Sequence, residues 1–311
     1  MGRSLSMSIL GRTGLEVSRL GYGTAIGKHL DEIAWGRLLN DVLDSGINFI
    51  DTANDYGVGW GLPAEGVIGR HISSRRSEFF LATKCGCPPG DGERPNWGGE
   101  HIWTRENAFR GLHESLKRLN TDYIDVMQYH NPSVEEVQEG GLVEALTDMR
   151  QEGKVRWLGI STTLPHLPTF LSWGIFDTFQ IPYSALERDH ENWITKSAQA
   201  GGGIIVRGGV AQGDPSAGPT ATTTFGGGSE DKWRKFKEAN LDDLLDENET
   251  RTSLILRYTL SHPNADTNIV GTSNPDHLKE NLAAIDKGVL PEEIYSDMKI
   301  RLEAVGLKPS D

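Results

Sequence analysis

The amino-acid sequence predicts an α/β protein, a (β/α)8 TIM barrel that takes up residues 1–311 as a single domain. Short apolar runs alternate with helical patterns eight times along the chain, which is typical of a parallel sheet with crossover helices. A length of 311 residues is one that such barrels use as one domain. Polar and ionisable residues follow several of the apolar runs, which indicates an active site at one rim of the sheet. On pattern alone, an open doubly wound sheet is the alternative.

The first segment predicts a hairpin outside the repeat. Residues 7–17 carry a Gly-Arg-Thr-Gly turn between short apolar segments, and we expect this hairpin to close the bottom of the barrel. The first strand of the barrel is expected over residues 20–24. The helix that follows, over residues 31–45, stops at Gly46 and has apolar residues at helical spacing: Ile33, Leu38, Leu39, Val42 and Leu43.

The next three strand–helix units follow the same rule. Short apolar runs predict strands over residues 48–52, 79–84 and 123–130. Helical patterns predict helices over residues 64–73, 105–119 and 141–151. Thr104 precedes the second of these helices as an N-cap, and Gly153 follows the third as a stop signal.

The last four units complete the count that a closed barrel needs. Strands are expected over residues 155–161, 178–184, 203–207 and 268–272. Helices are expected over residues 164–173, 191–200, 252–261 and 276–285, with further helices at the C-terminal end. An early Pro in the first of these helices is compatible with its first turn.

Three segments interrupt the alternation. Residues 85–103 are rich in Pro and Gly and leave the third strand, so we expect them to overhang the site. Residues 211–229 have the composition of a flexible lid over a cofactor. Residues 230–251 mix apolar and charged residues, which predicts an amphipathic surface helix that serves as scaffold rather than site.

Composition excludes several classes of function. The net charge of −13 and the isoelectric point near 5.2 argue against non-specific nucleic-acid binding. No apolar run is long enough to span a membrane and no secretory signal begins the chain, so we expect a cytoplasmic protein without a membrane partner. Cys85 and Cys87 have no second pair to complete a zinc site, and we expect free thiols and no metal.

Four ionisable residues stand at or just beyond the ends of three successive expected strands. Asp51 and Tyr56 follow the second strand, Lys84 ends the third, and His130 ends the fourth. A Tyr hydroxyl has an ordinary pKa near ~10 and becomes a useful acid only beside a cation such as a Lys ammonium. Taken singly, Asp51 could cap a turn, Lys84 could be a surface lysine and His130 a core histidine.

Together these residues resemble a known family. Asp51 and Tyr56 in DTANDYG, Lys84 in ATK and His130 in QYH closely resemble the Asp, Tyr, Lys and His tetrad of the aldo-keto reductases. The resemblance extends from LGRTGLEVSRLGYGT near the start to GTSNPDHLKENL near the end. It is specific because four separated motifs occur in the family's order, each on the expected kind of element.

The resemblance implies reversible hydride transfer between a nicotinamide dinucleotide and an aldehyde or ketone, or the corresponding alcohol or sugar. Tyr56 would give its proton to the carbonyl oxygen, and His130 would orient that oxygen. Lys84 would lower the pKa of Tyr56, and Asp51 would hold Lys84 protonated and in place. The physiological direction and the substrate stay open.

The resemblance also implies a set of cofactor-binding residues. Ser161 and Gln180 match the pair that binds the carboxamide, and Thr24 lies with Asp51 near the nicotinamide ribose. Thr162 stands where many relatives have Asn, and Arg207, followed by Gly208, stands where an aromatic ring usually stacks.

The last-strand motif of the family would bind the adenosine end of the dinucleotide. It holds the candidate residues Gly271, Thr272, Ser273, His277, Glu280 and Asn281. Relatives that prefer a 2′-phosphate have Lys or Arg within this motif, whereas Gly271, Ser273 and His277 occupy the matching positions here. We therefore expect NADP(H) on the family pattern, with NAD(H) usable as well.

Two other classes of function remain open on the sequence. One is a nucleotide-binding regulatory barrel with reduced catalysis, and the other is a barrel lyase or isomerase that uses Lys84 as a Schiff base. The oligomeric state is not predicted. Four aromatic residues are candidates for lining a substrate pocket: Tyr22, Trp60, Trp97 and Tyr129.

Overall fold

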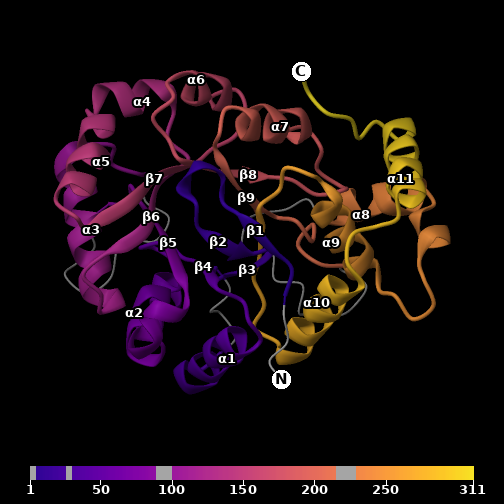
Figure 1. The fold of residues 1–311 in the computed structure, drawn as a ribbon, viewed down its shortest axis with the longest axis horizontal. Coiled ribbons are helices and arrows are strands. Elements are labelled where there is room, and N and C mark those ends of the chain that lie inside the picture. The colour runs from indigo at the N-terminus through magenta and orange to yellow at the C-terminus, as the bar shows by residue number, and fades with distance from the viewer. Residues whose placement is uncertain (1–4, 26–29, 89–99, 215–228) are drawn as a thin grey trace.

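A computed structural model describes residues 5–25, 30–88, 100–214 and 229–311. Its centre is a closed barrel of parallel strands in the order β10, β3, β4, β5, β6, β7, β8 and β9, which confirms the predicted TIM barrel (Figure 1). The barrel strands are β3 (Leu20–Gly23), β4 (Phe49–Asp51), β5 (Phe80–Cys85), β6 (Ile124–His130), β7 (Val155–Ser161), β8 (Thr178–Pro182), β9 (Gly203–Arg207) and β10 (Thr267–Val270).

Helices surround this barrel on its outside (Figure 1). Those that follow the strands in the expected alternation are α1 (Glu32–Asp44), α2 (Ala64–His71), α3 (Arg105–Leu119), α5 (Leu142–Gln151), α6 (Leu167–Ser172), α7 (Glu191–Gln199), α9 (Arg251–Ser261) and α10 (Pro275–Lys287). The predicted N-cap Thr104 accepts from the amide of Asn107, and Asp31 caps α1 by accepting from the amide of Ala34.

The N-terminal hairpin lies at the bottom of the barrel, as expected. Strands β1 (Met7–Ile9) and β2 (Glu16–Ser18) pair antiparallel around a short 3₁₀ turn, η1 (Gly11–Thr13). Gly11 has a φ of +46°, and any Cβ there would collide with the backbone of Gly203 on β9. Leu10 and Val17 are fully buried in a small cluster with strand residues of the barrel: Phe49, Ala82, Val126 and Ile205. The hairpin therefore plugs the end of the barrel opposite the C-terminal ends of its strands.

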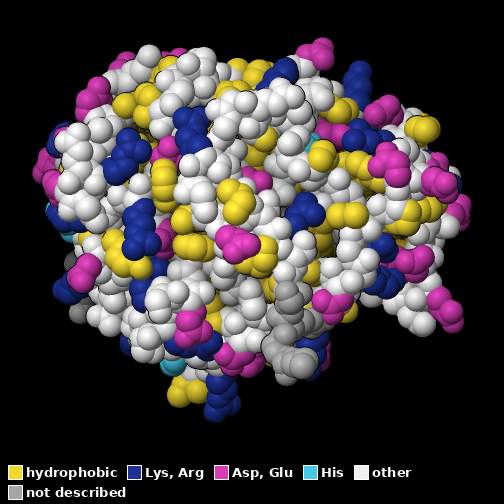
Figure 2. Space-filling view, in the orientation of Figure 1, with side chains coloured by type: hydrophobic (Ala, Val, Ile, Leu, Met, Phe, Trp, Pro, Cys, Tyr) yellow, Lys and Arg dark blue, Asp and Glu magenta, His cyan; other side chains and the backbone are white. Residues whose placement is uncertain are grey.

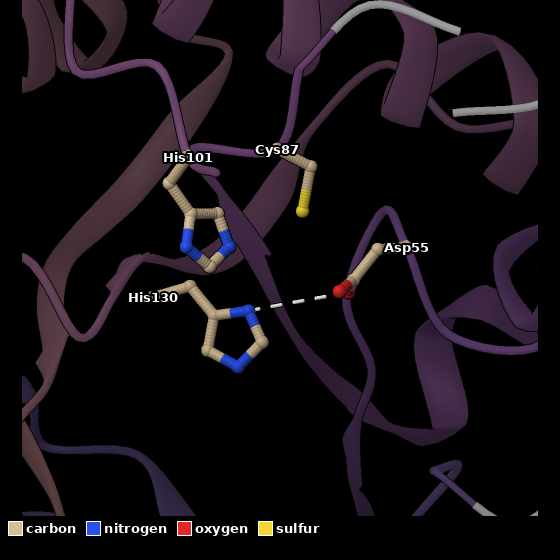
Figure 3. A group of neighbouring side chains, drawn as sticks. All are labelled: Asp55, Cys87, His101 and His130. Carbon is tan, nitrogen blue, oxygen red and sulfur yellow. Dashed lines mark ion pairs between the residues drawn. The ribbon is translucent and has the colours of Figure 1, made fainter. Parts of the chain in front are cut away.

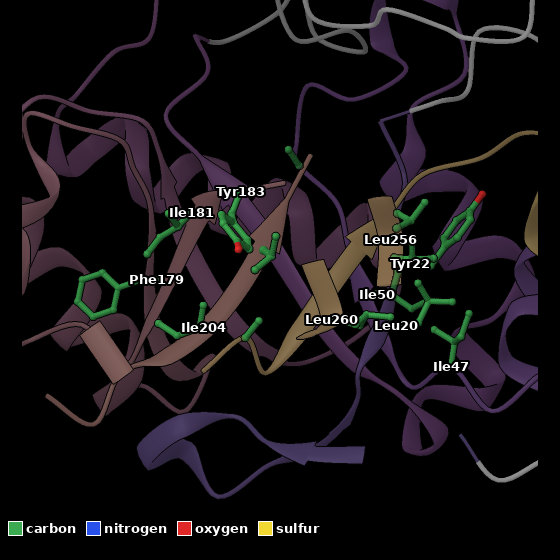
Figure 4. Close-up of a cluster of buried hydrophobic side chains, with 14 of the residues drawn as sticks. Leu20, Tyr22, Ile47, Ile50, Phe179, Ile181, Tyr183, Ile204, Leu256 and Leu260 are labelled. Carbon is green, nitrogen blue, oxygen red and sulfur yellow. The ribbon is translucent and has the colours of Figure 1, made fainter. Parts of the chain in front are cut away.

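The main hydrophobic cluster extends from Leu5 to Leu302 and joins the barrel strands to the outer helices. Figure 4 shows part of it, with side chains from β3, β4, β8, β9 and α9. Ile33 differs from the expectation for α1, because its side chain is 60% exposed, whereas Trp35 is fully buried. The other four predicted residues of α1 are buried, so its buried face is the predicted one, with Trp35 instead of Ile33 in the first turn.

Several elements lie outside the predicted alternation. They are the helices α4 (Val134–Glu139), α8 (Ser229–Glu238) and α11 (Glu292–Ala304) and the 3₁₀ turns η3 (Val58–Trp60), η4 (Ser73–Glu78) and η6 (Leu241–Leu244). Residues 89–99 of the expected overhang and 215–228 of the expected lid lie outside the described residues.

Charged side chains of both signs are interspersed over the face of the molecule in Figure 2, and hydrophobic ones are scattered among them. In the part of the chain that the structure describes, no helix is both long enough and apolar enough to cross a membrane.

Candidate active site

A buried ion pair forms where β4 and β5 end. Asp51 is the last residue of β4, and Lys84 lies near the end of the neighbouring strand β5. The Lys84 Nζ donates to Asp51 Oδ1 at 2.5 Å and to the carbonyl of Thr52 at 3.0 Å. Neither Asp51 nor Lys84 is more than 1% exposed. Although burial alone would lower the pKa of Lys84, the charges of Asp51 and Tyr56 raise it above its ordinary value.

The second carboxylate oxygen of Asp51 accepts from two amides. Gln128 Nε2 on β6 donates to Asp51 Oδ2 at 3.1 Å, and Gln180 Nε2 on β8 donates to it at 2.7 Å. The charge of Asp51 is therefore compensated by groups from three other strands. Gln128 was not among the predicted site residues, although a polar amide inside the strand β6 was a signal for it.

Tyr56 lies on the turn after β4, above this pair. Gly57 follows it with a φ of +76°, a conformation that favours glycine and directs the turn. The Lys84 Nζ lies 4.9 Å from the centroid of the Tyr56 ring. Burial raises the pKa of Tyr56 to about 12, and Lys84 lowers it only in part, while Asp51 and Asp55 raise it further. The expected net lowering is therefore wrong for this structure, because burial outweighs the lysine charge.

His130 faces Tyr56 from the end of β6. The two ring centroids are 5.8 Å apart with an interplanar angle of 77°. Burial lowers the pKa of His130 well below its ordinary value, and the charges of Lys84, His101 and Arg207 act in the same direction. A neutral imidazole can donate one N–H to an oxygen, so His130 is a hydrogen-bond donor rather than a cation near neutral pH.

A cavity of about 460 Å³ opens at this rim of the barrel. Asp51, Tyr56 and His130 line it, whereas Lys84 lies beneath them and does not. All but one of the residues predicted to bind the cofactor line it as well: Asp51, Ser161, Gln180, Arg207, Gly208, Gly271, Thr272, Ser273, His277, Glu280 and Asn281. Thr24 is the exception, because it is fully buried and its Oγ1 donates to the carbonyl of Asp51 at 3.1 Å.

The cavity brings in residues that the sequence analysis missed. Asn131 follows His130 with a φ of +61°, and its Oδ1 accepts from Ser161 Oγ at 3.4 Å and Arg207 Nη2 at 3.5 Å. The Nε of Arg207 is buried and has no hydrogen-bond partner among the described residues. Burial lowers the pKa of Arg207. A positive φ at a strand end is not visible in a sequence pattern, so nothing there identified Asn131.

Two cations at the outer side of the cavity come from a segment expected to be scaffold. Lys232 on α8 pairs with Glu187 at 2.5 Å, and Arg251 at the start of α9 pairs with Asp242 at 2.6 Å and with Asp214 at 3.3 Å. Both cations line the cavity. Residues 230–251, which were expected to serve as scaffold rather than site, therefore contribute side chains to the cavity wall.

Two aromatic candidates for the pocket are structural instead. The Oη of Tyr22 donates to the carbonyl of Thr272 at 2.8 Å, and the Oη of Tyr129 donates to the carbonyl of Leu142 at 2.8 Å. Both rings are buried and neither lines the cavity. Trp97 and the side chain of Trp60 lie outside the described residues.

Known proteins resemble this chain in sequence and in fold. Residues 19–302 match the model of the aldo/keto reductase family. An aldo-keto reductase of Bacillus subtilis (strain 168) is 31% identical over 94% of this chain and 92% of its own length. An NADH-specific methylglyoxal reductase of Escherichia coli (strain K12) is 28% identical over 89% of this chain and 92% of its own length. The holo form of an aldo-keto reductase from Bacillus halodurans has a TM-score of 0.80 at 28% identity, with 96% of each chain covered.

Proposed function

The chain belongs to the aldo-keto reductase family, and on that premise we propose that it reduces a small aldehyde or ketone with a nicotinamide dinucleotide, or runs the reverse reaction. One observation carries the proposal. Lys84 pairs with Asp51 and lies close to the ring of Tyr56, which faces His130, and Asp51, Tyr56 and His130 line the cavity. This arrangement supplies a proton donor and an oxygen-orienting donor to one position.

The residues around the cavity fit a dinucleotide. At the inner end, the hydroxyl of Ser161 and the amide of Gln180 suit a carboxamide. The buried Nε of Arg207 has no hydrogen-bond partner among the described residues and could donate to the dinucleotide. At the outer end, α10 begins at Pro275, and helix N-termini favour anionic groups such as phosphates. Glu280 and Asn281, one turn further along α10, suit the amino group of an adenine.

The reaction follows from the states of these groups. The bound nucleotide supplies the hydride in the direction of reduction. Tyr56 holds its proton at neutral pH and gives it to the carbonyl oxygen as negative charge develops there. Lys84 stabilises the phenolate that remains, and Asp51 keeps Lys84 in position. His130 donates a neutral N–H to the same oxygen and orients it.

The buried ion pair argues against a Schiff-base mechanism. A lysine nucleophile must be neutral and must reach the substrate. Lys84 is fully buried, pairs with Asp51 and does not line the cavity, and its pKa is raised rather than lowered.

We predict that Tyr56→Phe lowers kcat for carbonyl reduction by roughly 10²- to 10⁴-fold, which is the usual contribution of general acid catalysis. The dissociation constant of the nucleotide should stay nearly unchanged, because only a hydroxyl in the proton-transfer step is removed. Steady-state kinetics with a panel of aldehydes, together with fluorescence titration of the nucleotide, measures both quantities.

Tyr129→Phe is the matched control, since it removes a buried hydroxyl from the same barrel outside the cavity. Retention of most of the turnover by Tyr56→Phe would remove Tyr56 from the mechanism. Tight nucleotide binding by the parent protein without turnover of any carbonyl would favour a regulatory barrel instead.

We further propose that NADPH is preferred only modestly and that NADH is usable. Gly271, Ser273 and His277 line the cavity where a 2′-phosphate clamp would need a Lys or Arg. The nearby cations Lys232 and Arg251 are already paired with carboxylates. A 2′-phosphate would therefore gain less from this site than from an unpaired guanidinium.

His277→Arg should increase the ratio of the NADH to the NADPH dissociation constant, because it adds a bidentate phosphate donor. Fluorescence titrations with both nucleotides measure the ratio. Lys279 lies two residues further along α10, does not line the cavity and is largely exposed, so Lys279→Arg is the control. A parent preference for NADPH of several orders of magnitude would contradict this interpretation.

A further inference from the structure

Four potential metal ligands converge beside the proposed site. Asp55, Cys87, His101 and His130 each offer one ligand atom, and these atoms all lie within 4.8 Å of one another. Figure 3 shows their side chains pointing toward a common centre. They come from separate parts of the chain: the turn after β4, the segment after β5, the approach to α3, and the end of β6. The fold therefore assembles the group, and no short sequence motif does.

Two atoms of this group are buried without a hydrogen-bond partner. Among the described residues, neither His130 Nδ1 nor Asp55 Oδ1 has one, and His130 is only 8% exposed. The two atoms face each other at 3.9 Å, too far for a hydrogen bond. Unsatisfied polar atoms inside a protein cost free energy, so their occurrence together points to a ligand that fills the space between them.

We propose that Asp55, Cys87, His101 and His130 bind one divalent transition-metal ion of the zinc class. Thiolate, imidazole and carboxylate are the ligands that Zn²⁺ takes, usually four in a tetrahedron. Metal–ligand bonds of about 2.0–2.3 Å place neighbouring ligand atoms roughly 3.3–3.8 Å apart. The 3.9 Å between His130 and Asp55 is already close to such an edge, and the other atoms need small side-chain movements.

The ion would affect the reaction through the ring nitrogen of His130 that it binds. His130 lines the cavity, and its Nδ1 lies on the side of Asp55 while its other ring nitrogen points away from the group (Figure 3). An ion on Nδ1 fixes the proton on Nε2, which is the tautomer that donates to a substrate oxygen. Four protein ligands fill a tetrahedral shell, so the ion positions His130 and does not contact the substrate. This consequence rests on the proposed function, whereas metal binding itself does not.

Titration of the full-length protein with Co²⁺ and with Zn²⁺, after removal of bound metal by a chelator and without nucleotide or substrate, tests the site. We expect one equivalent of Co²⁺ to give the intense near-ultraviolet absorption of thiolate-to-cobalt charge transfer, and one equivalent of Zn²⁺ to abolish it. Cys87→Ser should remove this absorption and weaken Zn²⁺ binding by more than the roughly 10- to 100-fold that loss of a supporting residue costs. Cys85→Ser is the matched control, because Cys85 is an equally buried free thiol outside the group.

His101→Gln provides a second variant, and it should weaken Zn²⁺ binding while retaining the cobalt–thiolate absorption. Circular dichroism establishes that each variant is folded. Unchanged metal affinity in folded Cys87→Ser and His101→Gln, or no thiolate absorption in the parent, would overturn the proposal. Because no turnover is measured, this result stands apart from the Tyr56→Phe test: a protein that binds the metal but reduces no carbonyl would contradict the proposed function alone.

Discussion

At the scale of single residues, the four chemical groups were predictable and their environment was not. Asp51, Tyr56, Lys84 and His130 each follow or end a short apolar run, and such positions indicate a rim of polar groups in the sequence itself. Their pKa values depend on burial and on contacts between distant strands. Lys84 was correctly expected to lower the pKa of Tyr56, but the depth of burial that reverses the net direction appears only in three dimensions.

The Asp51–Lys84 pair leads to a stability prediction. Lys84→Met should lower the free energy of unfolding by roughly 3–5 kcal/mol, since it leaves a buried carboxylate without its cation. The double variant Asp51→Asn with Lys84→Met should recover much of this loss, because the uncompensated charge is then removed. Urea unfolding of the single and double variants measures the coupling.

Both the single and the double variant should have low turnover. The recovery of stability in the double variant should therefore come without a recovery of activity. Equal stabilities of Lys84→Met and the parent would show that water or other groups compensate Asp51. A double variant less stable than Lys84→Met would contradict the argument that the unpaired charge of Asp51 causes the loss of stability.

At the scale of elements, the apolar periodicity and the helix start and stop signals of the sequence predicted most of the barrel. The strands and the helices between them were found within a few residues, because apolar periodicity and capping signals agree there. Helix α4 was missed because it is only six residues long and half of these are acidic, with a Ser133 capping box as its main signal. The segment 230–251 was misplaced because an amphipathic pattern shows which face is apolar but not what lies beside the polar face.

The hairpin plug gives a prediction about an element. Leu10→Ala should lower the free energy of unfolding by about 2–5 kcal/mol, because the leucine is fully buried against barrel strands and its loss leaves a cavity. The kcat should change little, since the hairpin lies at the end of the barrel opposite the site. Urea unfolding and steady-state kinetics of the same preparation measure both.

Met7→Ala in the same hairpin is the control, because the Met7 side chain is 38% exposed. A large fall in kcat at full stability in Leu10→Ala would show that the plug communicates with the opposite rim.

At the scale of the whole molecule, one hydrophobic cluster runs through nearly all elements, and we propose that the chain unfolds as one domain. The barrel order was predictable because eight strand–helix units admit few arrangements. The cavity was not, because its outer wall comes from α8, α9 and α10, whose positions beside one another depend on tertiary packing.

The buried His262 makes the free energy of unfolding depend on pH. Burial lowers the pKa of His262 to about 4, against about 6.5 in an unfolded chain. The unfolded state therefore binds the proton at higher pH than the folded state does. This contribution to the free energy of unfolding is complete above pH ~6.5 and is lost as pH falls toward about 4, by a total on the order of 3 kcal/mol.

Urea unfolding at a series of pH values measures this slope. His262→Gln should flatten it between pH ~4 and ~6.5, because the substituted side chain does not titrate. His113→Gln removes an exposed histidine as the control. An unchanged slope in His262→Gln would mean that other groups carry the acid sensitivity.

The carboxylate of Asp51 has a consequence for how this chain can change over generations. It accepts from Lys84, Gln128 and Gln180, which stand on three different strands. A substitution at any one of these donors alters the hydrogen bonding that the other two need, so the effects of changes at these positions are not additive. The order in which substitutions at these positions can accumulate is therefore restricted. A library that varies one donor at a time will miss combinations of substitutions that function only together.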